Sequence, residues 1–147
     1  MAKASGSAKP RIRRGQTRSS ALLIIEDDVF LAKMMARMLE AEGIECTLAG
    51  NGREGLRRAT SLRPRLIILD IILPDLDGFA VLSKLKANAA TKRIPVLIVS
   101  NLGQEEDIQQ GLSLGAQDYI VKSDLSLDDV VAKVKQITKG RGVPVVF

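Results

Sequence analysis

Four short apolar runs of the sequence each end in a side chain that could take part in chemistry. The acids Glu26 and Asp27 follow the first run, Asp70 follows the second, Ser100 ends the third and Lys122 follows the fourth. If these runs are parallel strands, their carboxyl ends share the edge at which open α/β sheets bind ligands. Clustered carboxylates repel one another unless a cation joins them, and Mg²⁺ prefers oxygen ligands. The spacing therefore indicates a Mg²⁺-assisted phosphoryl site.

The residue types exclude several other kinds of site. The chain of 147 residues contains no histidine, which rules out Ser-His-Asp and Cys-His catalysis and a histidine-ligated zinc site. Its one cysteine, Cys46, excludes an internal disulfide and is typical of a reducing compartment. The sequence has no apolar run of membrane-spanning length and no signal-peptide pattern. These features predict a cytoplasmic protein that does not enter a membrane.

The net charge of +5 is distributed unevenly along the chain. Residues 1–20 contain six basic residues and no acidic one, whereas the rest of the chain has 16 basic and 17 acidic residues. Small polar residues without apolar periodicity are typical of disorder. We therefore predict a disordered basic tail at 1–20, one domain at 21–139 and a short C-terminal tail at 140–147. Nucleic acid is not an expected partner, except through weak, non-specific binding to the basic tail.

Short β-branched runs alternate with amphipathic segments from residue 21 onward, which predicts an α/β fold of repeated βα units. With right-handed crossovers, the expected fold is a doubly wound, five-stranded parallel sheet of strand order 2-1-3-4-5. In the first helix, we expect Phe30, Met34, Met38 and Leu39 to face the core. The expected strands are 21–26, 44–49, 65–70, 95–99 and 118–121, and the expected helices are 29–42, 53–61, 78–88, 104–113 and 127–138.

The motifs at the strand ends resemble those of two-component response-regulator receiver domains, which have a CheY-like, flavodoxin-like fold. The run Asp70-Ile-Ile-Leu-Pro-Asp-Leu-Asp-Gly78 is similar to the family's phospho-acceptor loop, and Ile24-Ile-Glu-Asp-Asp28 is similar to its acidic pocket. Ser100 stands where the family has Ser or Thr, and Tyr119-Ile-Val-Lys122 resembles its switch aromatic and lysine. The resemblance covers about residues 21–138.

This resemblance implies that Asp70 is phosphorylated with Mg²⁺ as the cofactor. The implied metal ligands are carboxylate oxygens of Asp27 and Asp70 and the backbone carbonyl of Ile72. Glu26 is implied to act on the metal through a bound water. The protein is then not an enzyme, apart from catalysing its own aspartyl phosphorylation and dephosphorylation.

Further roles are implied for residues around the acidic pocket. Lys122 and Ser100 would stabilise the phosphoryl group, and Ser100 would form a switch together with Tyr119. Ile72 lies two residues beyond the acceptor Asp70, and Leu102 lies two residues beyond Ser100. Residues at these two positions would tune the dephosphorylation rate. Because both side chains are apolar, we expect a long-lived phosphoryl group. Ser123 follows Lys122 at a place where many receivers have a cis proline, which leaves the geometry of this bond open.

The implied phosphodonor is a histidine kinase or a histidine phosphotransfer protein. A downstream protein target is expected on the face formed by segments 104–113, 118–121 and 127–138. We expect a stand-alone receiver whose output is phosphorylation-dependent binding, with a homodimer left open. Two alternatives are a phosphorylation-independent interaction module on the same fold and a nucleic-acid-associated adaptor that acts through the basic tail.

Three other functions each fit part of the pattern. The run Gly50-Asn-Gly-Arg-Glu-Gly55 has the dinucleotide-binding spacing G-x-G-x-x-G, but the strand before it is half polar and is expected at the sheet edge. A haloacid-dehalogenase-type phosphatase would need an acid where Ile72 stands. A Toprim-like nuclease could use Glu26 with Asp75 and Asp77, which leaves the other strand-end groups without a role.

Overall fold

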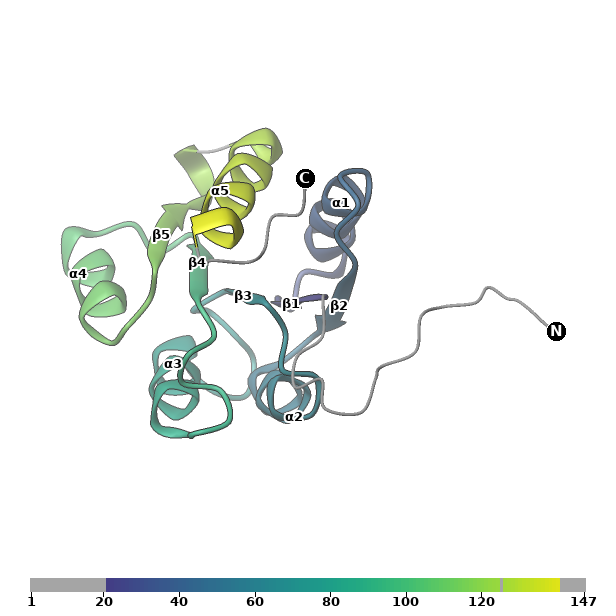
Figure 1. Cartoon of the computed structure of the whole chain (residues 1–147). Coiled ribbons are helices and arrows are strands. Elements are labelled where there is room, and N and C mark those ends of the chain that lie inside the picture. Colours follow the sequence, from purple (N-terminus) through teal and green to yellow (C-terminus); the bar gives the residue numbers. More distant parts are fainter. Residues whose placement is uncertain (1–20, 125, 141–147) are drawn as a thin grey trace, which may run out of the picture.

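The computed structural model describes residues 21–124 and 126–140, so the segments 1–20 and 141–147 of the expected tails lie outside the described residues. Strands and helices alternate from end to end (Figure 1). The strands are β1 (Leu22–Ile25), β2 (Cys46–Ala49), β3 (Leu66–Leu69), β4 (Val96–Ser100) and β5 (Asp118–Val121). The helices are α1 (Val29–Glu40), α2 (Gly52–Leu62), α3 (Gly78–Ala87), α4 (Glu105–Ser113), the 3₁₀ turn η1 (Lys122–Asp124) and α5 (Leu127–Gly140).

All five strands are parallel and pair in the order β2-β1-β3-β4-β5, which confirms the predicted topology. The register places Ile25 of β1 opposite Leu69 of β3. The residues that follow these two strands therefore leave the sheet side by side. Strand order reverses between β1 and β3, which is where ligands bind in folds of this kind.

The three central strands are apolar on both sides because helices cover both faces of the sheet. Alternate residues of each strand contribute to two separate cores. Leu23 and Ile25 pack with residues of α2 and α3, whereas Leu22 and Ile24 pack with residues of α1 and α5. Figure 1 shows the same layers, with α1 and α5 on one face and α2 and α3 on the other. No helix of the described residues is long and apolar enough to cross a membrane.

The predicted inward face of α1 is only partly right. Leu39 is buried as expected, but Phe30 is 74% exposed and Met34 and Met38 are only partly buried. The small side chains of Ala32 and Ala36 lie on the face of α1 that packs against the sheet. Met35 lies on the same face and is the methionine of α1 that is buried. The buried residues have the spacing i, i+3, i+4 and i+7 and are Ala32, Met35, Ala36 and Leu39.

Candidate functional site

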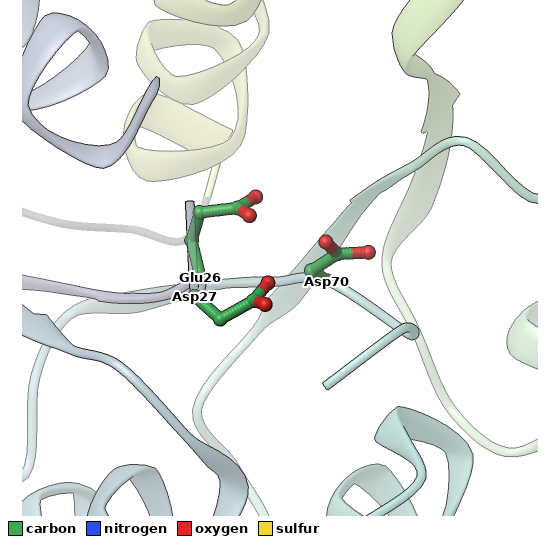
Figure 2. A group of neighbouring side chains, drawn as sticks. All are labelled: Glu26, Asp27 and Asp70. Carbon is green, nitrogen blue, oxygen red and sulfur yellow. The ribbon is translucent and has the colours of Figure 1, made fainter. Parts of the chain in front are cut away.

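Three carboxylates meet at the carboxyl edge of the sheet, as predicted. Glu26 and Asp27 follow β1, Asp70 follows β3, and one oxygen from each lies within 4.8 Å of the others (Figure 2). Glu26 and Asp70 are buried, with 3% and 4% of their surface exposed, whereas Asp27 is exposed. The cluster therefore has a closed inner side and one side that is open to solvent.

Lys122 supplies the positive charge on the closed side of this cluster. Its Nζ lies 2.9 Å from Oε1 of Glu26 and 3.0 Å from Oδ2 of Asp70. The contact with Asp70 is a hydrogen bond. The contact with Glu26 is an ion pair, so one ammonium group bridges the two buried carboxylates. Lys122 thus acts as an internal counterion that Glu26 and Asp70 share.

The pKa values of the buried groups reflect this arrangement. Burial raises the pKa of Glu26 above its usual value, and the nearby charge of Lys122 only partly offsets the effect. Burial alone would lower the pKa of Lys122, but its contacts with Glu26 and Asp70 outweigh burial and raise it. The ammonium of Lys122 is therefore protonated at neutral pH and remains available to a ligand with negative charge.

The remaining oxygens of the two buried acids are held by backbone amides. Oδ1 of Asp70 accepts a hydrogen bond from the backbone N–H of Ile72 at 3.1 Å, and Oε2 of Glu26 accepts one from Asp28 at 3.0 Å. These bonds restrain the orientation of both carboxylates. Three neighbouring carboxylates, one of them exposed, are hard oxygen donors of the kind that a divalent cation such as Mg²⁺ binds.

Ser100 and Tyr119 meet at the backbone of Leu102. The fully buried Ser100 hydroxyl accepts a hydrogen bond from the Leu102 N–H at 3.3 Å, and the Tyr119 hydroxyl donates one to the Leu102 carbonyl at 2.6 Å. A Cβ at Gly111 would lie 2.7 Å from Cδ1 of Ile98 and 3.0 Å from the Tyr119 ring, so a side chain there would crowd this ring position. Burial, with smaller effects of Asp107 and Asp70, raises the pKa of Tyr119. The predicted switch residues are therefore physically connected.

Two acids that the nuclease alternative requires are used elsewhere. The carboxylate of Asp77 accepts the Phe79 N–H at 2.9 Å and caps α3. The carboxylate of Asp75 accepts the N–H groups of Gly52 and Arg53 at 2.7 and 2.9 Å. Desolvation is the largest single effect on Asp75 and would raise its pKa, but the backbone hydrogen bonds together outweigh it and lower the pKa. Asp75 therefore holds the loop after β3 against the start of α2.

The same contact explains the glycine-rich run before α2. A dinucleotide would place its pyrophosphate at the N-terminus of this helix, but Asp75 already binds the N–H groups there. Gly55 instead allows close packing, because a side chain there would lie 2.5 Å from Ile25. The role of Asp75 as the acceptor at the start of α2 is not visible in the sequence, because its partners lie more than twenty residues away in the chain.

The pocket rim contains the remaining predicted residues. Ile72 is 52% exposed and Leu102 is half-buried. Lys122 leads directly into η1, which the sequence analysis did not predict. No peptide bond among the described residues is cis, so the Lys122–Ser123 bond is trans.

Comparison with known proteins identifies the family. The sequence profile of the response regulator receiver domain matches residues 22–135. This chain belongs to that family. Receiver domains of this family belong to the response regulators of two-component systems, and the acid cluster of this chain could hold a metal ion.

The curated relatives of this receiver domain include longer regulatory proteins. The DNA-binding dual master transcriptional regulator RpaA of Synechocystis sp. is 36% identical over 118 residues, which are 80% of this chain and 48% of RpaA. The transcriptional regulatory protein PrrA of Mycobacterium leprae is 38% identical over 124 residues, which are 84% of this chain and 52% of PrrA. The chain thus spans about half the length of these relatives.

Solved receiver structures have the same fold. The Clostridium difficile two-component response regulator has a TM-score of 0.78 and 30% identity, and the comparison covers 84% of this chain and 99% of that one. The Francisella response regulator 1452 receiver domain has a TM-score of 0.77 and 29% identity, with the same coverage of both chains. A CheY-like receiver from Methanospirillum hungatei also matches, with a TM-score of 0.77 and 27% identity over 84% of this chain and 96% of that one.

Proposed function

We propose that residues 21–139 form a receiver domain that is phosphorylated on Asp70 by a histidine kinase or a histidine phosphotransfer protein in the cytoplasm. The observation that carries this proposal is the position of Asp70. Its carboxylate lies 3.0 Å from the ammonium of Lys122 and within the same cluster as the exposed carboxylate of Asp27. A carboxylate with a fixed cation on one side and space for a metal on the other is arranged for phosphoryl transfer.

The proposed reaction is an in-line transfer to the Asp70 carboxylate. One carboxylate oxygen attacks the phosphorus, the bond from phosphorus to the donor nitrogen breaks, and its electron pair leaves with the histidine. The aspartyl phosphate adds about 1.5 to 2 negative charges. Lys122 neutralises part of this charge, and the Ser100 hydroxyl is the group on β4 that can donate a hydrogen bond to a phosphoryl oxygen. Catalysis consists mainly of positioning and charge neutralisation.

The residues present also fit a metal ion. Asp27 and Asp70 would hold Mg²⁺ together with the Ile72 backbone carbonyl, and Glu26 would act through a metal-bound water. When bound, Mg²⁺ supplies positive charge that favours phosphoryl transfer onto the carboxylate. The contact between Glu26 and Lys122 adds a second role, because Glu26 also orients the ammonium toward Asp70.

A direct test uses acetyl phosphate as a small phosphodonor. We expect the full chain to show a retarded band on a phosphate-affinity gel after incubation with acetyl phosphate and Mg²⁺. The band should be absent when EDTA removes the metal. A retarded band of equal strength with EDTA would contradict the role of the metal.

The output of the domain is proposed to be binding of a protein target through α4, β5 and α5. We predict that phosphorylation draws Ser100 toward the phosphoryl group and opens space that Tyr119 fills by turning inward. Tyr119 is the only tyrosine of the chain, so its ring signals in NMR spectra are unambiguous. Beryllofluoride with Mg²⁺, a phosphoryl analogue, should shift these signals.

The matched control for this switch is the Asp70→Asn variant. Asparagine lacks the carboxylate to which beryllofluoride binds when it mimics the aspartyl phosphate. The Tyr119 signals of this variant should stay unchanged when beryllofluoride is added. If the wild-type ring signals also stay unchanged, the coupling between the pocket and β5 does not exist.

We predict a long-lived phosphoryl group because the rim residues Ile72 and Leu102 cannot hold a hydrolytic water through hydrogen bonds. The double variant Ile72→Asn with Leu102→Glu should lose its phosphate faster, by about tenfold or more, because polar side chains can position the attacking water. The hydrogen bonds of Leu102 to Ser100 and Tyr119 use backbone atoms and survive the substitution. Intact mass measured over time after donor removal gives the rates.

The control for the lifetime is Leu112→Glu, which adds the same charge at an exposed apolar residue of α4. Its decay rate should equal that of the wild type. Equal decay of the double variant and the wild type would remove the proposed role of the rim.

A further inference from the structure

Basic and acidic residues are segregated within the domain. Residues 50–95 contain nine basic and four acidic residues, a net charge of +5. Residues 21–49 and 96–139 together contain six basic and thirteen acidic residues, a net charge of −7. The basic half forms α2, β3 and α3, and Figure 1 shows α2 and α3 next to each other on one face of the sheet. A nearly neutral domain therefore has one strongly basic face.

The four acids of this half do not neutralise that face. Asp70 lies in the phosphorylation pocket, and Asp75 and Asp77 bind backbone N–H groups at the start of α2 and α3. Glu54 is engaged by Arg58 at 3.0 Å. Asp75 also lies 3.9 Å from Nε of Arg53 through its Oδ2. The four acids thus offset only part of the positive charge, and this half keeps a net charge of +5.

We define the basic face by Arg53 and Arg57 of α2, Arg63 and Arg65 between α2 and β3, Lys84 of α3, and Lys92. The side chain of Arg53 is 72% exposed, and Arg57, Lys84 and Lys92 are exposed as well. Among the described residues, Arg57, Arg63 and Arg65 make no ion pair.

The basic face also adjoins the point at which the N-terminal segment enters the fold. The backbone N–H of Arg65 donates to the carbonyl of Ala21 at 3.0 Å. Residues 1–20, with six basic residues, precede Ala21 directly. The sequence thus places six basic residues before the residue whose carbonyl Arg65 binds, and they add to the net positive charge of the full chain.

Arg63 stands at a backbone position that favours glycine. Its backbone has φ 50° and ψ 63°, the left-handed conformation in which glycine is favoured. Gly43 and Gly115 have φ 84° and 111° at the turns that follow α1 and α4. Arg63 can therefore be replaced by glycine without loss of the turn after α2, which makes it a suitable position for removing a charge from the basic face.

We propose that the basic face binds the phosphate backbone of nucleic acid. Five of the nine basic residues of this half are arginines of α2 and its exit turn, and the planar guanidinium group matches phosphate oxygens in pairs. A membrane surface would favour apolar anchors beside the cations. The exposed large apolar residues of the described chain lie on other elements or at the pocket rim: Val29, Phe30, Ile72 and Leu112. Binding is independent of base sequence and of phosphorylation at Asp70.

The test measures binding of the full chain to a fluorescein-labelled duplex oligonucleotide of random sequence by anisotropy at increasing salt. Arg57→Gln combined with Arg63→Gly removes two charges from the basic face. The matched control, Lys33→Gln with Arg37→Gln, removes two exposed charges from α1 on the opposite face of the sheet. We expect the face variant to bind about tenfold more weakly at low salt, with a salt slope smaller by about two. The control should bind within about twofold of the wild type.

Folding is checked separately, because Arg63→Gly alone should unfold at or above the wild-type temperature as glycine relieves the left-handed backbone. Weaker binding by a domain that is equally or more stable supports a direct contact. Equal loss of affinity in the face variant and the α1 control would overturn the proposal in favour of net charge alone. Absence of wild-type binding at low salt would also overturn it, as would binding to phosphatidylserine vesicles without binding to the duplex.

Discussion

Replacing Asp27 with alanine is expected to weaken Mg²⁺ binding by more than about tenfold. Loss of a residue that only hydrogen-bonds to a metal ligand often weakens metal binding about tenfold, and Asp27 is proposed to bind the metal directly. The variant should also fail to accept a phosphoryl group. The fold should be retained, because Asp27 is exposed and its removal relieves repulsion within a cluster of three carboxylates. Calorimetric titration with Mg²⁺ measures the affinity, and thermal unfolding measures the fold.

The neighbouring acid provides the control for this experiment. The Asp28 carboxylate accepts the Leu31 N–H at 3.1 Å and caps α1, so Asp28→Ala removes the same charge from the same loop. It should bind Mg²⁺ nearly as well as the wild type, while the loss of the cap lowers the unfolding free energy by about 1 kcal/mol. Wild-type Mg²⁺ affinity in the Asp27 variant would refute its assignment as a ligand.

The second large effect is expected at Lys122. Substitution by methionine removes the ammonium and leaves the buried carboxylates of Glu26 and Asp70 without their counterion. Breaking a buried ion pair in this way costs about 3 kcal/mol in unfolding free energy. Added Mg²⁺ should restore more stability to the variant than to the wild type, because the metal then supplies the missing charge. Denaturant unfolding at neutral pH, with Mg²⁺ and with EDTA, measures both effects.

A surface pair of the same type is the reference for this prediction. Lys133 lies 2.8 Å from Asp118 with both side chains partly exposed. Lys133→Met should therefore change the unfolding free energy by less than about 1 kcal/mol and should not respond to Mg²⁺. If the two methionine variants were equally stable in EDTA, Lys122 would not be the counterion of the buried acids.

The sequence predicted the elements that depend on local pattern. The apolar runs located all five strands, and the strand-end positions of Glu26, Asp27 and Asp70 were enough to place them at one edge. Ser126 and Asp129 have the spacing of a capping box at the start of α5, and both of its hydrogen bonds form. These features follow from spacing along the chain, so they need no knowledge of the packed structure.

Contacts between residues that are far apart in the sequence could not be predicted from local spacing. Asp75 caps a helix whose start precedes it by more than twenty residues. Lys122 follows β5 and contacts Glu26 after β1, with β3 and β4 between these two strands. The exposure of Phe30 followed from close packing of small residues in α1. Segregation of charge onto α2 and α3 was concealed because the whole domain is close to neutral.

The site of modification tests the central claim most directly. Intact mass should show one added phosphoryl group on the wild type after incubation with acetyl phosphate and Mg²⁺, and none on Asp70→Asn. Asp77→Asn is the matched control, because asparagine also caps a helix and Asp77 lies outside the acid cluster. It should be modified like the wild type. A phosphoryl group on Asp70→Asn, or none on the wild type with Mg²⁺ present, would contradict phosphorylation of Asp70.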